Sequence, residues 1–363
     1  MTNKVTDQLS LLEMMVSDTA DAPAEFSIDG PTAGFLQRFQ ADLREKGLRK
    51  MALEGSRLLN TIGACNYSPL QQMHYNLEQR LEAGEIDRDE HRLLAQASGV
   101  IFDKHRVNLL PYELSLEDLN HAAYRACELY ARATGAKPPG AFSFSDAFYP
   151  EYMFEIEGRR YSYLGLYYYC RYAFCAQYVD FDKLENVVEI GSGSGRAVEI
   201  IKKLHPRVTF HLLDLAPQLY VSQRFLESLF PEDIVNYELT RRGAPARTVK
   251  PGGIHFYPHY RIADLQLEGP TLSWNTMVFC IMSPDRAKRY FDEMRRLAEH
   301  VYVVEPTTAA GGAQYGLSEP NTFEHYARFM NDGYRLVARQ PAFRPLAPIK
   351  AWGGVDDMLW RRT

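Results

Sequence analysis

The second half of the chain alternates short β-branched runs with helical stretches, and this alternation restricts the fold more than any other feature. The runs are NVVEI, VTFHLLDL, GIHFYP, TMVFCIM and HVYVVEP, and the helical stretches between them centre on residues 196–204, 216–229 and 285–299. Strands that alternate with helices predict an α/β fold with a mainly parallel sheet. A further helix near residues 319–330 and two closing strands, YRLVARQ and DDMLWRR, complete the pattern.

The first half of the chain has a helical pattern instead. Apolar residues recur at three- and four-residue spacing from about Thr32 to Ala133, and the breaker Lys137-Pro138-Pro139-Gly140 follows. A β-hairpin with Glu157-Gly158 at its turn and an aromatic helix, LYYYCRYAFCAQYV, come next. The sequence therefore predicts a mobile tail over 1–25, a helical N-terminal domain over 26–160 and an α/β domain over 161–363.

Composition excludes several classes of protein. Of the 363 residues 46% are hydrophobic, which is ample for a core, and the net charge of -5 argues against a nucleic-acid binder. No apolar run approaches the roughly 20 residues of a membrane span, and the start shows no secretory signal. Five cysteines without a C-x-x-C pair argue against structural zinc. A reducing cytoplasm is the expected setting.

A glycine-rich loop marks the expected ligand site. The strand 186–190 leads into Gly191-Ser192-Gly193-Ser194-Gly195 and then into a helix. Glycines allow a sharp turn and a close approach of backbone to ligand, and parallel sheets bind ligands at the carboxyl ends of their strands. The next strand ends in Asp214, 19 residues after Gly195, where a carboxylate can accept both hydroxyl protons of a ribose. The pair predicts a nucleoside-cofactor site.

The spacing of the glycines distinguishes between cofactors. A nicotinamide or flavin fingerprint reads G-x-G-x-x-G, whereas here the third glycine comes one residue early and Arg196 stands in its expected place. A P-loop is excluded because no G-K-[ST] follows. A dehydrogenase-like site and a purely structural glycine turn remain as alternatives.

E-x-G-x-G-x-G, with Glu189 at its head, resembles motif I of the class I S-adenosylmethionine-dependent methyltransferases. The resemblance covers roughly residues 160–363. It implies a Rossmann-like, mostly parallel sheet with an antiparallel last strand, and S-adenosylmethionine as the cofactor. It also implies a set of cofactor-binding residues: Glu189, Gly191, Gly193, Gly195, Asp214, Leu215, Tyr257 and Met282. The motif [DN]-P-P-[FY] of nucleobase N-methyltransferases is absent, since Met282-Ser283-Pro284-Asp285 stands there.

The helical first half and the stretch SYLGLYYYCRY further resemble the sugar O-methyltransferase family. This narrower resemblance implies O-methylation of a sugar or glycosylated metabolite. A sugar hydroxyl needs a base, and His259 is the first candidate because it ends the third strand and histidine titrates near neutral pH. Asp285 and Glu305 are further catalytic candidates on the expected substrate side. No readable metal site accompanies them, so we expect no metal.

Two tyrosines and two rival functions complete the prediction. Tyr161 and Tyr163 precede the aromatic helix and are the expected substrate contacts, since tyrosine offers an apolar face and a polar tip. The rivals are N-methylation of an amine or amino acid in natural-product biosynthesis, which needs no strong base, and a non-catalytic cofactor-binding protein. The N-terminal helices could form a lid, a substrate wall or the interface of a homodimer.

Overall fold

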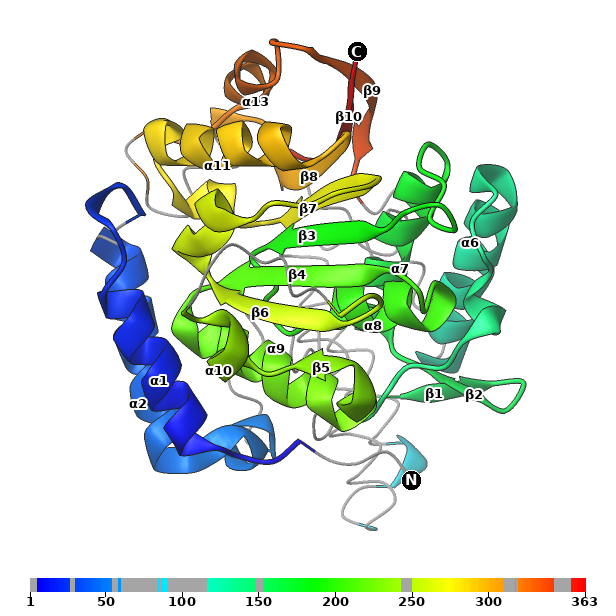
Figure 1. Ribbon diagram of the computed structural model, residues 1–363. Coiled ribbons are helices and arrows are strands. Elements are labelled where there is room, and N and C mark those ends of the chain that lie inside the picture. Colours follow the sequence, from blue (N-terminus) through cyan, green and yellow to red (C-terminus); the bar gives the residue numbers. More distant parts are fainter. Residues whose placement is uncertain are drawn as a thin grey trace.

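The computed structural model describes residues 5–26, 30–53, 58–59, 84, 87–89, 116–147, 153–242, 250–309, 317, 319–342 and 354–363. An eight-stranded sheet forms its centre, with the strand order β5-β6-β4-β3-β7-β8-β10-β9 (Figure 1). In that order the strands are Ile234–Val235, Ile254–Pro258, Thr209–Asp214, Asn186–Ile190, Thr271–Thr276, His300–Pro306, Val355–Arg362 and Tyr334–Pro341.

The pairing of the strands confirms the predicted fold class. β5, β6, β4, β3, β7 and β8 pair in parallel, whereas β10 runs antiparallel to both of its neighbours, β8 and β9. The last strand of the chain is thus inserted antiparallel between two earlier ones. The order reverses between β3 and β7, and this reversal is where open parallel sheets bind their ligands.

Helices cover both faces of the sheet and make two separate cores. One face carries Leu212, Trp274 and Tyr302 and packs against α7 (Tyr163–Ala176), α8 (Arg196–Leu204) and α9 (Ala216–Leu229). The other carries Leu213, Ile190 and Val303 and packs against η4 (His259–Asp264), α11 (Pro284–Leu297) and α13 (Phe323–Phe329). All five residues of β3 are buried, as a central strand of a two-sided sheet requires.

Arg196, which departs from the dinucleotide fingerprint, has a structural partner. Its guanidinium is fully buried, donates to Glu199 over 3.0 Å and to the carbonyl of Ser145 over 3.2 Å, and lies 4.7 Å from the ring centre of Phe225. Glu199 also accepts from the backbone N–H of Ser145 over 2.7 Å. The side chain that replaces the third glycine therefore joins α8 to the segment before the hairpin.

The predicted fourth strand is wrong in position. The run TMVFCIM suggested a strand at 276–282, but β7 occupies Thr271–Thr276 and Phe279–Ile281 forms the 3₁₀ turn η5. Met277 ends the strand with a positive φ of 61°, and its N–H donates to the carbonyl of Val304 over 2.8 Å. The strand was predicted too late in the chain because the prediction relied on apolar composition alone. Tertiary contacts hold residues 278–280 in a turn instead.

The N-terminal segment is also different from the prediction. Within the expected mobile tail, residues 9–20 form a helix, α1 (Leu9–Ala20), that buries Leu11, Leu12 and Met15, so the prediction of a tail is wrong there. Asp18 of α1 accepts from Tyr237 over 2.7 Å and from Nε of Arg241 over 2.6 Å. Together with α2 (Gly30–Leu53), this helix lies along the side of the sheet at which β4 and β6 end (Figure 1).

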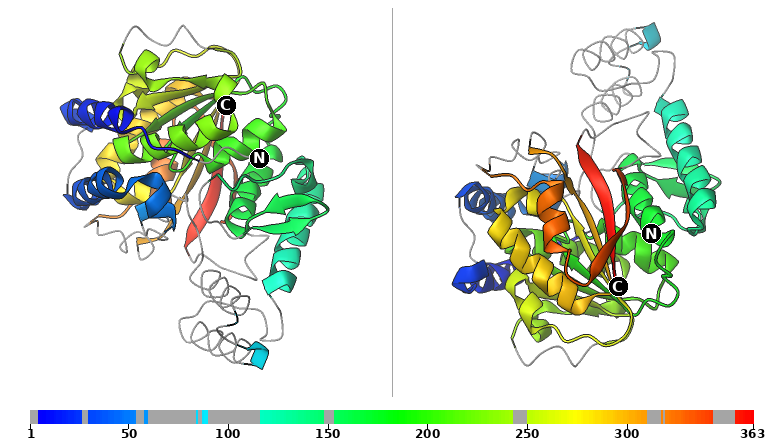
Figure 2. Two further views of the ribbon diagram at one scale, coloured as in Figure 1. Left: turned by 90° about the horizontal axis from the view of Figure 1, so that it is seen from below. Right: turned by 90° about the horizontal axis from the view of Figure 1, so that it is seen from above.

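Among the described helices of the N-terminal half, α6 (Leu116–Thr134) lies apart from α1 and α2. Figure 2 shows α6 on the side opposite to α1 and α2. The predicted hairpin is confirmed as β1 (Phe154–Ile156) and β2 (Arg159–Tyr161), with Glu157 and Gly158 at positive φ in the turn. The aromatic helix is confirmed as α7, which begins where the side chain of Ser162 accepts from the N–H of Gly165 over 3.0 Å.

Candidate functional site

The glycine loop connects β3 to α8 through three residues with positive φ, at 79° for Gly191, 53° for Gly193 and 81° for Gly195. Side-chain-bearing residues rarely adopt this conformation. Gly191 is confined further, because an added Cβ would lie 2.0 Å from Cγ2 of Val278. The loop thus turns tightly under the segment that follows β7, and places its backbone N–H groups at the carboxyl edge of the sheet.

Asp214 reaches the glycine loop from the neighbouring strand, as the sequence spacing predicted. Its carboxylate accepts from the N–H of Gly193 over 2.8 Å and from the N–H of Leu215 over 2.7 Å. Burial raises the pKa of Asp214 to about 7, although the backbone N–H groups of Gly193 and Leu215 and the hydroxyl of Ser192 act to lower it. A carboxylate has about four acceptor sites, so one remains for a further donor. Acid and loop are therefore joined at the point where the two strands end.

Glu305, the last residue but one of β8, is fully buried and accepts three consecutive backbone N–H groups. The distances are 2.6 Å from Val278, 2.7 Å from Phe279 and 2.9 Å from Cys280. Burial raises its pKa to about 7, and the three N–H groups lower it. Both oxygens are engaged by the backbone, which is the arrangement of an anchor and not of an accessible base, so the geometry does not support the predicted catalytic role.

His259 opens η4 directly after β6 and is 4% exposed. Its Nε2 lies 3.0 Å from the carbonyl oxygen of Phe26, which can only accept, so Nε2 carries the proton. Nδ1 has no hydrogen-bond partner within the described part of the chain. Burial lowers the pKa of His259 to about 4, which makes its imidazole a weak base at neutral pH. The geometry therefore gives little support to general-base catalysis by His259.

Phe26 is a part of this edge that the sequence did not indicate. It ends the 3₁₀ turn η1 (Ala24–Phe26), and its ring centre lies 6.5 Å from His259 and 5.6 Å from Tyr290 of α11, edge-on to both. Asn321, before α13, is a second such residue and contacts the carbonyls of Phe279 and Met282. Neither position carries a local motif, because each acts through a contact with a distant segment.

The other predicted cofactor residues lie around the same edge, with different surroundings. Glu189 is buried one residue before the end of β3, and burial raises its pKa well above the ordinary value. Leu215 and Met282 are half-buried. The ring of Tyr257 is buried and stacks at 6.0 Å on His211, within the core of the α11 face. The cofactor candidates thus lie near the carboxyl ends of the parallel strands, with Glu189 and Tyr257 on opposite faces of the sheet.

The predicted substrate residues do not join them. Tyr161 has no exposed surface, donates to the carbonyl of Pro139 over 3.3 Å and packs on Tyr124 at 4.8 Å between ring centres. A side chain enclosed in this way cannot contact a substrate, so this prediction is wrong. Tyr163 begins α7, and its side chain lies outside the described residues. Asp285 is exposed in the first turn of α11, where its role as a catalytic group stays a prediction.

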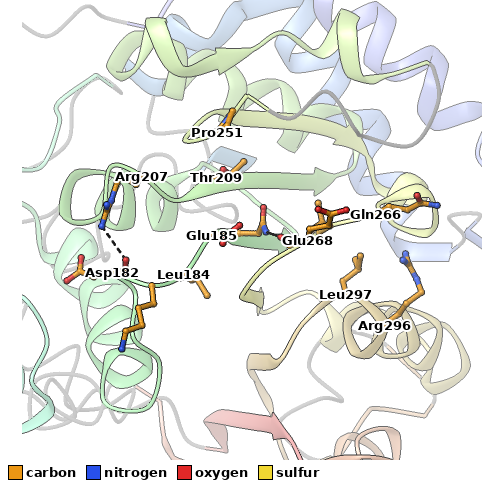
Figure 3. Close-up of a pocket in the computed structure, with 13 residues that line it drawn as sticks. Asp182, Leu184, Glu185, Arg207, Thr209, Pro251, Gln266, Glu268, Arg296 and Leu297 are labelled. Carbon is orange, nitrogen blue, oxygen red and sulfur yellow. Dashed lines mark hydrogen bonds between the residues drawn. The ribbon is translucent and has the colours of Figure 1, made fainter.

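A groove of about 930 Å³ opens at the opposite edge of the sheet, where the parallel strands begin (Figure 3). Side chains of both charges line it: Asp182, Lys183, Glu185, Arg207, Glu268 and Arg296. Parallel sheets bind ligands at the carboxyl ends of their strands, so we place the candidate site at the glycine loop and not in this groove.

The described residues contain no group of three or more His, Cys, Asp or Glu side chains arranged to hold a metal ion. In the same ranges, no helix has both the length and the apolar composition needed to cross a membrane.

No family model and no curated protein matches the sequence. Among solved structures, the O-methyltransferase NcsB1 from neocarzinostatin biosynthesis, in complex with S-adenosylmethionine and 2-hydroxy-5-methyl naphthoic acid, is 15% identical over 51% of each chain, with a TM-score of 0.37. The present chain therefore spans about half the length of NcsB1.

Two further structures match over more of their length. The pyocyanin biosynthetic protein PhzM is 15% identical over 92% of this chain and 100% of its own, with a TM-score of 0.41. The mitomycin 7-O-methyltransferase MmcR is 14% identical over the same shares, with a TM-score of 0.38. Independently of these similarities, the strand order, the antiparallel last strand and the glycine loop after β3 agree with the Rossmann-like sheet that the resemblance of the sequence to class I S-adenosylmethionine-dependent methyltransferases implies.

Proposed function

We propose that the protein is a methyltransferase that uses S-adenosylmethionine and acts on a small molecule in the cytoplasm, by O-methylation of a sugar or glycosylated metabolite. The observation that carries the proposal is the contact of the Asp214 carboxylate with the glycine loop, 2.8 Å from the N–H of Gly193, at the switch point of a sheet with this strand order. The sugar class rests on the resemblance of the sequence.

The residues at this edge suit the cofactor. Asp214 keeps a lone pair for a ribose hydroxyl, and Gly193 has no side chain in the way of the cofactor. When bound, the cofactor supplies the electrophilic methyl group; the protein supplies alignment and a shielded surface. Phe26 adds a wall from the N-terminal segment.

N-methylation of an amine or amino acid is the second candidate function, and one observation favours it. Of the three predicted bases, His259 has its pKa lowered to about 4, Glu305 is engaged by three N–H groups and Asp285 is exposed. A neutral amine attacks the methyl group without prior loss of a proton, whereas a sugar hydroxyl needs a base. Transfer of labelled methyl from S-adenosylmethionine to panels of sugars, glycosides and amines distinguishes the two.

Calorimetric titration of the purified protein with S-adenosylmethionine, S-adenosylhomocysteine and NAD tests the cofactor. We expect micromolar binding of the first two and no heat from NAD. The variant Asp214→Ala should lose about 1–3 kcal/mol of S-adenosylhomocysteine affinity, because the buried ribose hydroxyls lose their acceptor. Unchanged affinity would refute the role of Asp214, and binding of NAD alone would refute the proposed function.

A further inference from the structure

We propose that Glu305 and Asn321 are positioning residues, which together hold the segment 277–282, here called the clamped loop, against the glycine loop. The inference deepens the proposed function and rests on it, because the clamped loop follows β7 and borders the same carboxyl edge as Gly191 and Asp214. The proposed role of both residues is to position the loop, without contact with the reacting atoms.

Glu305 accepts hydrogen bonds from the backbone N–H groups of the clamped loop. Three successive N–H groups, those of Val278, Phe279 and Cys280, converge on one carboxylate within 2.6–2.9 Å. Hydrogen bonds to a charged acceptor are about twice as strong as neutral ones, and buried N–H groups without a partner are costly. Glu305 has no exposed surface, so water does not replace it. The turn η5 therefore depends on a side chain from β8.

Asn321 donates hydrogen bonds to the backbone carbonyls of the same loop. Its Nδ2 donates to the carbonyl of Phe279 over 2.9 Å and to that of Met282 over 2.8 Å, and the side chain is 1% exposed. Donors and acceptors of one short segment are thus bound by two side chains that come from different parts of the chain. Phe279 is held through both its N–H and its carbonyl.

The loop needs this support because its backbone is strained. Met277 has a φ of 61°, a left-handed conformation that is strained for a residue with a side chain. The conformation brings Cγ2 of Val278 to within 2.0 Å of where a Cβ on Gly191 would stand. The glycine loop and the clamped loop are therefore in direct contact, and displacement of Val278 would change the shape of the cofactor site.

Hydrogen exchange and S-adenosylhomocysteine titration of the full-length protein test the inference. In Glu305→Gln the amide NH₂ must face at least one of the three backbone N–H groups, so we expect faster deuterium exchange in the peptide that contains residues 278–280. We also expect an affinity for S-adenosylhomocysteine about tenfold lower, the effect of one lost charge-assisted hydrogen bond. Asn321→Ala serves as a milder second variant, with exchange faster in the same peptide and affinity reduced about threefold.

Asp357→Asn is the matched control. Asp357 is as buried as Glu305, lies in the neighbouring strand β10 and accepts from Tyr302 over 2.7 Å, with no contact to the clamped loop recorded in the described residues. Its replacement should lower overall stability and leave both exchange at 278–280 and affinity within twofold of wild type. Equal effects of Asp357→Asn and Glu305→Gln would overturn the assignment by showing a general loss of stability.

A double-mutant cycle separates positioning from general stability. If Glu305 acts by placing Val278, then Glu305→Gln should weaken S-adenosylhomocysteine binding much less in a Val278→Ala background than in wild type. Additive effects would overturn the inference. Wild-type protein that binds no S-adenosylhomocysteine would overturn the proposed function instead, and wild-type binding with unaltered affinity and exchange in Glu305→Gln would overturn the positioning role alone.

Discussion

At the scale of single residues, the strictest requirement is at Gly191. A Cβ there would meet Val278 at 2.0 Å and would also stand on a backbone with a φ of 79°. Gly191→Ala should therefore lose about 2–4 kcal/mol of unfolding free energy, from backbone strain and overpacking together. Gly135→Ala is the control, since Gly135 has a φ of 75° but no atom within 4 Å of an added Cβ. Equal losses of unfolding free energy in the two variants, measured by urea unfolding, would contradict the close contact between Gly191 and Val278.

His259 gives the pH dependence of stability a residue-scale test. Its pKa is lowered to about 4, so between pH 6.5 and 4 the unfolded chain binds more protons than the native protein, and stability falls as pH falls. A shift of this size corresponds to about 3 kcal/mol. Urea unfolding of His259→Gln should show a smaller loss from pH 7 to pH 4.5 than wild type.

The exposed His121 of α6 provides the comparison for that experiment. His121→Gln is the matched control for exchanging a histidine for glutamine at an exposed position. The other buried imidazoles that the structure describes, His205, His211 and His255, remain in both variants, so their contribution cancels in the difference. An unchanged slope in His259→Gln would show that His259 is not buried in its neutral form.

At the scale of elements, the attachment of α1 is the main surprise. Asp18 is 4% exposed and binds Arg241 through two nitrogens, at 2.6 and 2.5 Å, as well as Tyr237. Asp18→Ala should lose about 1–3 kcal/mol, because the buried hydroxyl of Tyr237 and the half-buried guanidinium of Arg241 lose their acceptor, and should speed proteolysis in residues 5–26. Glu13→Ala on the same helix breaks the exposed pair with Arg44 and should cost less than about 1 kcal/mol. Equal cleavage rates in the two variants would contradict this attachment.

Elements differ in how far local pattern predicts them. The strand 186–190 and the helices 196–204 and 216–229 agree with β3, α8 and α9 because each has a regular apolar pattern bounded by glycine or proline. The fourth strand was misplaced because β7, TLSWNT, is less apolar than the run that follows it. Burial between β3 and β8 selects Thr271–Thr276 as the strand, while Glu305 draws the next amides into a turn.

At the scale of the whole molecule, ligand binding should stabilise the native state. S-adenosylhomocysteine at one hundred times its Kd should raise the unfolding free energy by about 2.7 kcal/mol if it binds only the folded protein. Thermal unfolding followed by calorimetry measures the shift, with NAD at the same concentration as the control. A shift with NAD and none with S-adenosylhomocysteine would contradict the proposed cofactor.

The sequence by itself determined the α/β fold, the glycine loop and the acid that meets it. These features follow from spacing along the chain: side-chain periodicity sets each element, and two successive parallel strands bring Gly193 and Asp214 to one edge. Only the tertiary structure decided that Tyr161 is enclosed, that His259 is hydrogen-bonded to the carbonyl of Phe26, and that Glu305 anchors a backbone loop. Their partners are distant in sequence. Burial and hydrogen-bond partners shift the pKa of a polar side chain and decide its access to a ligand, and the residue type alone does not reveal them.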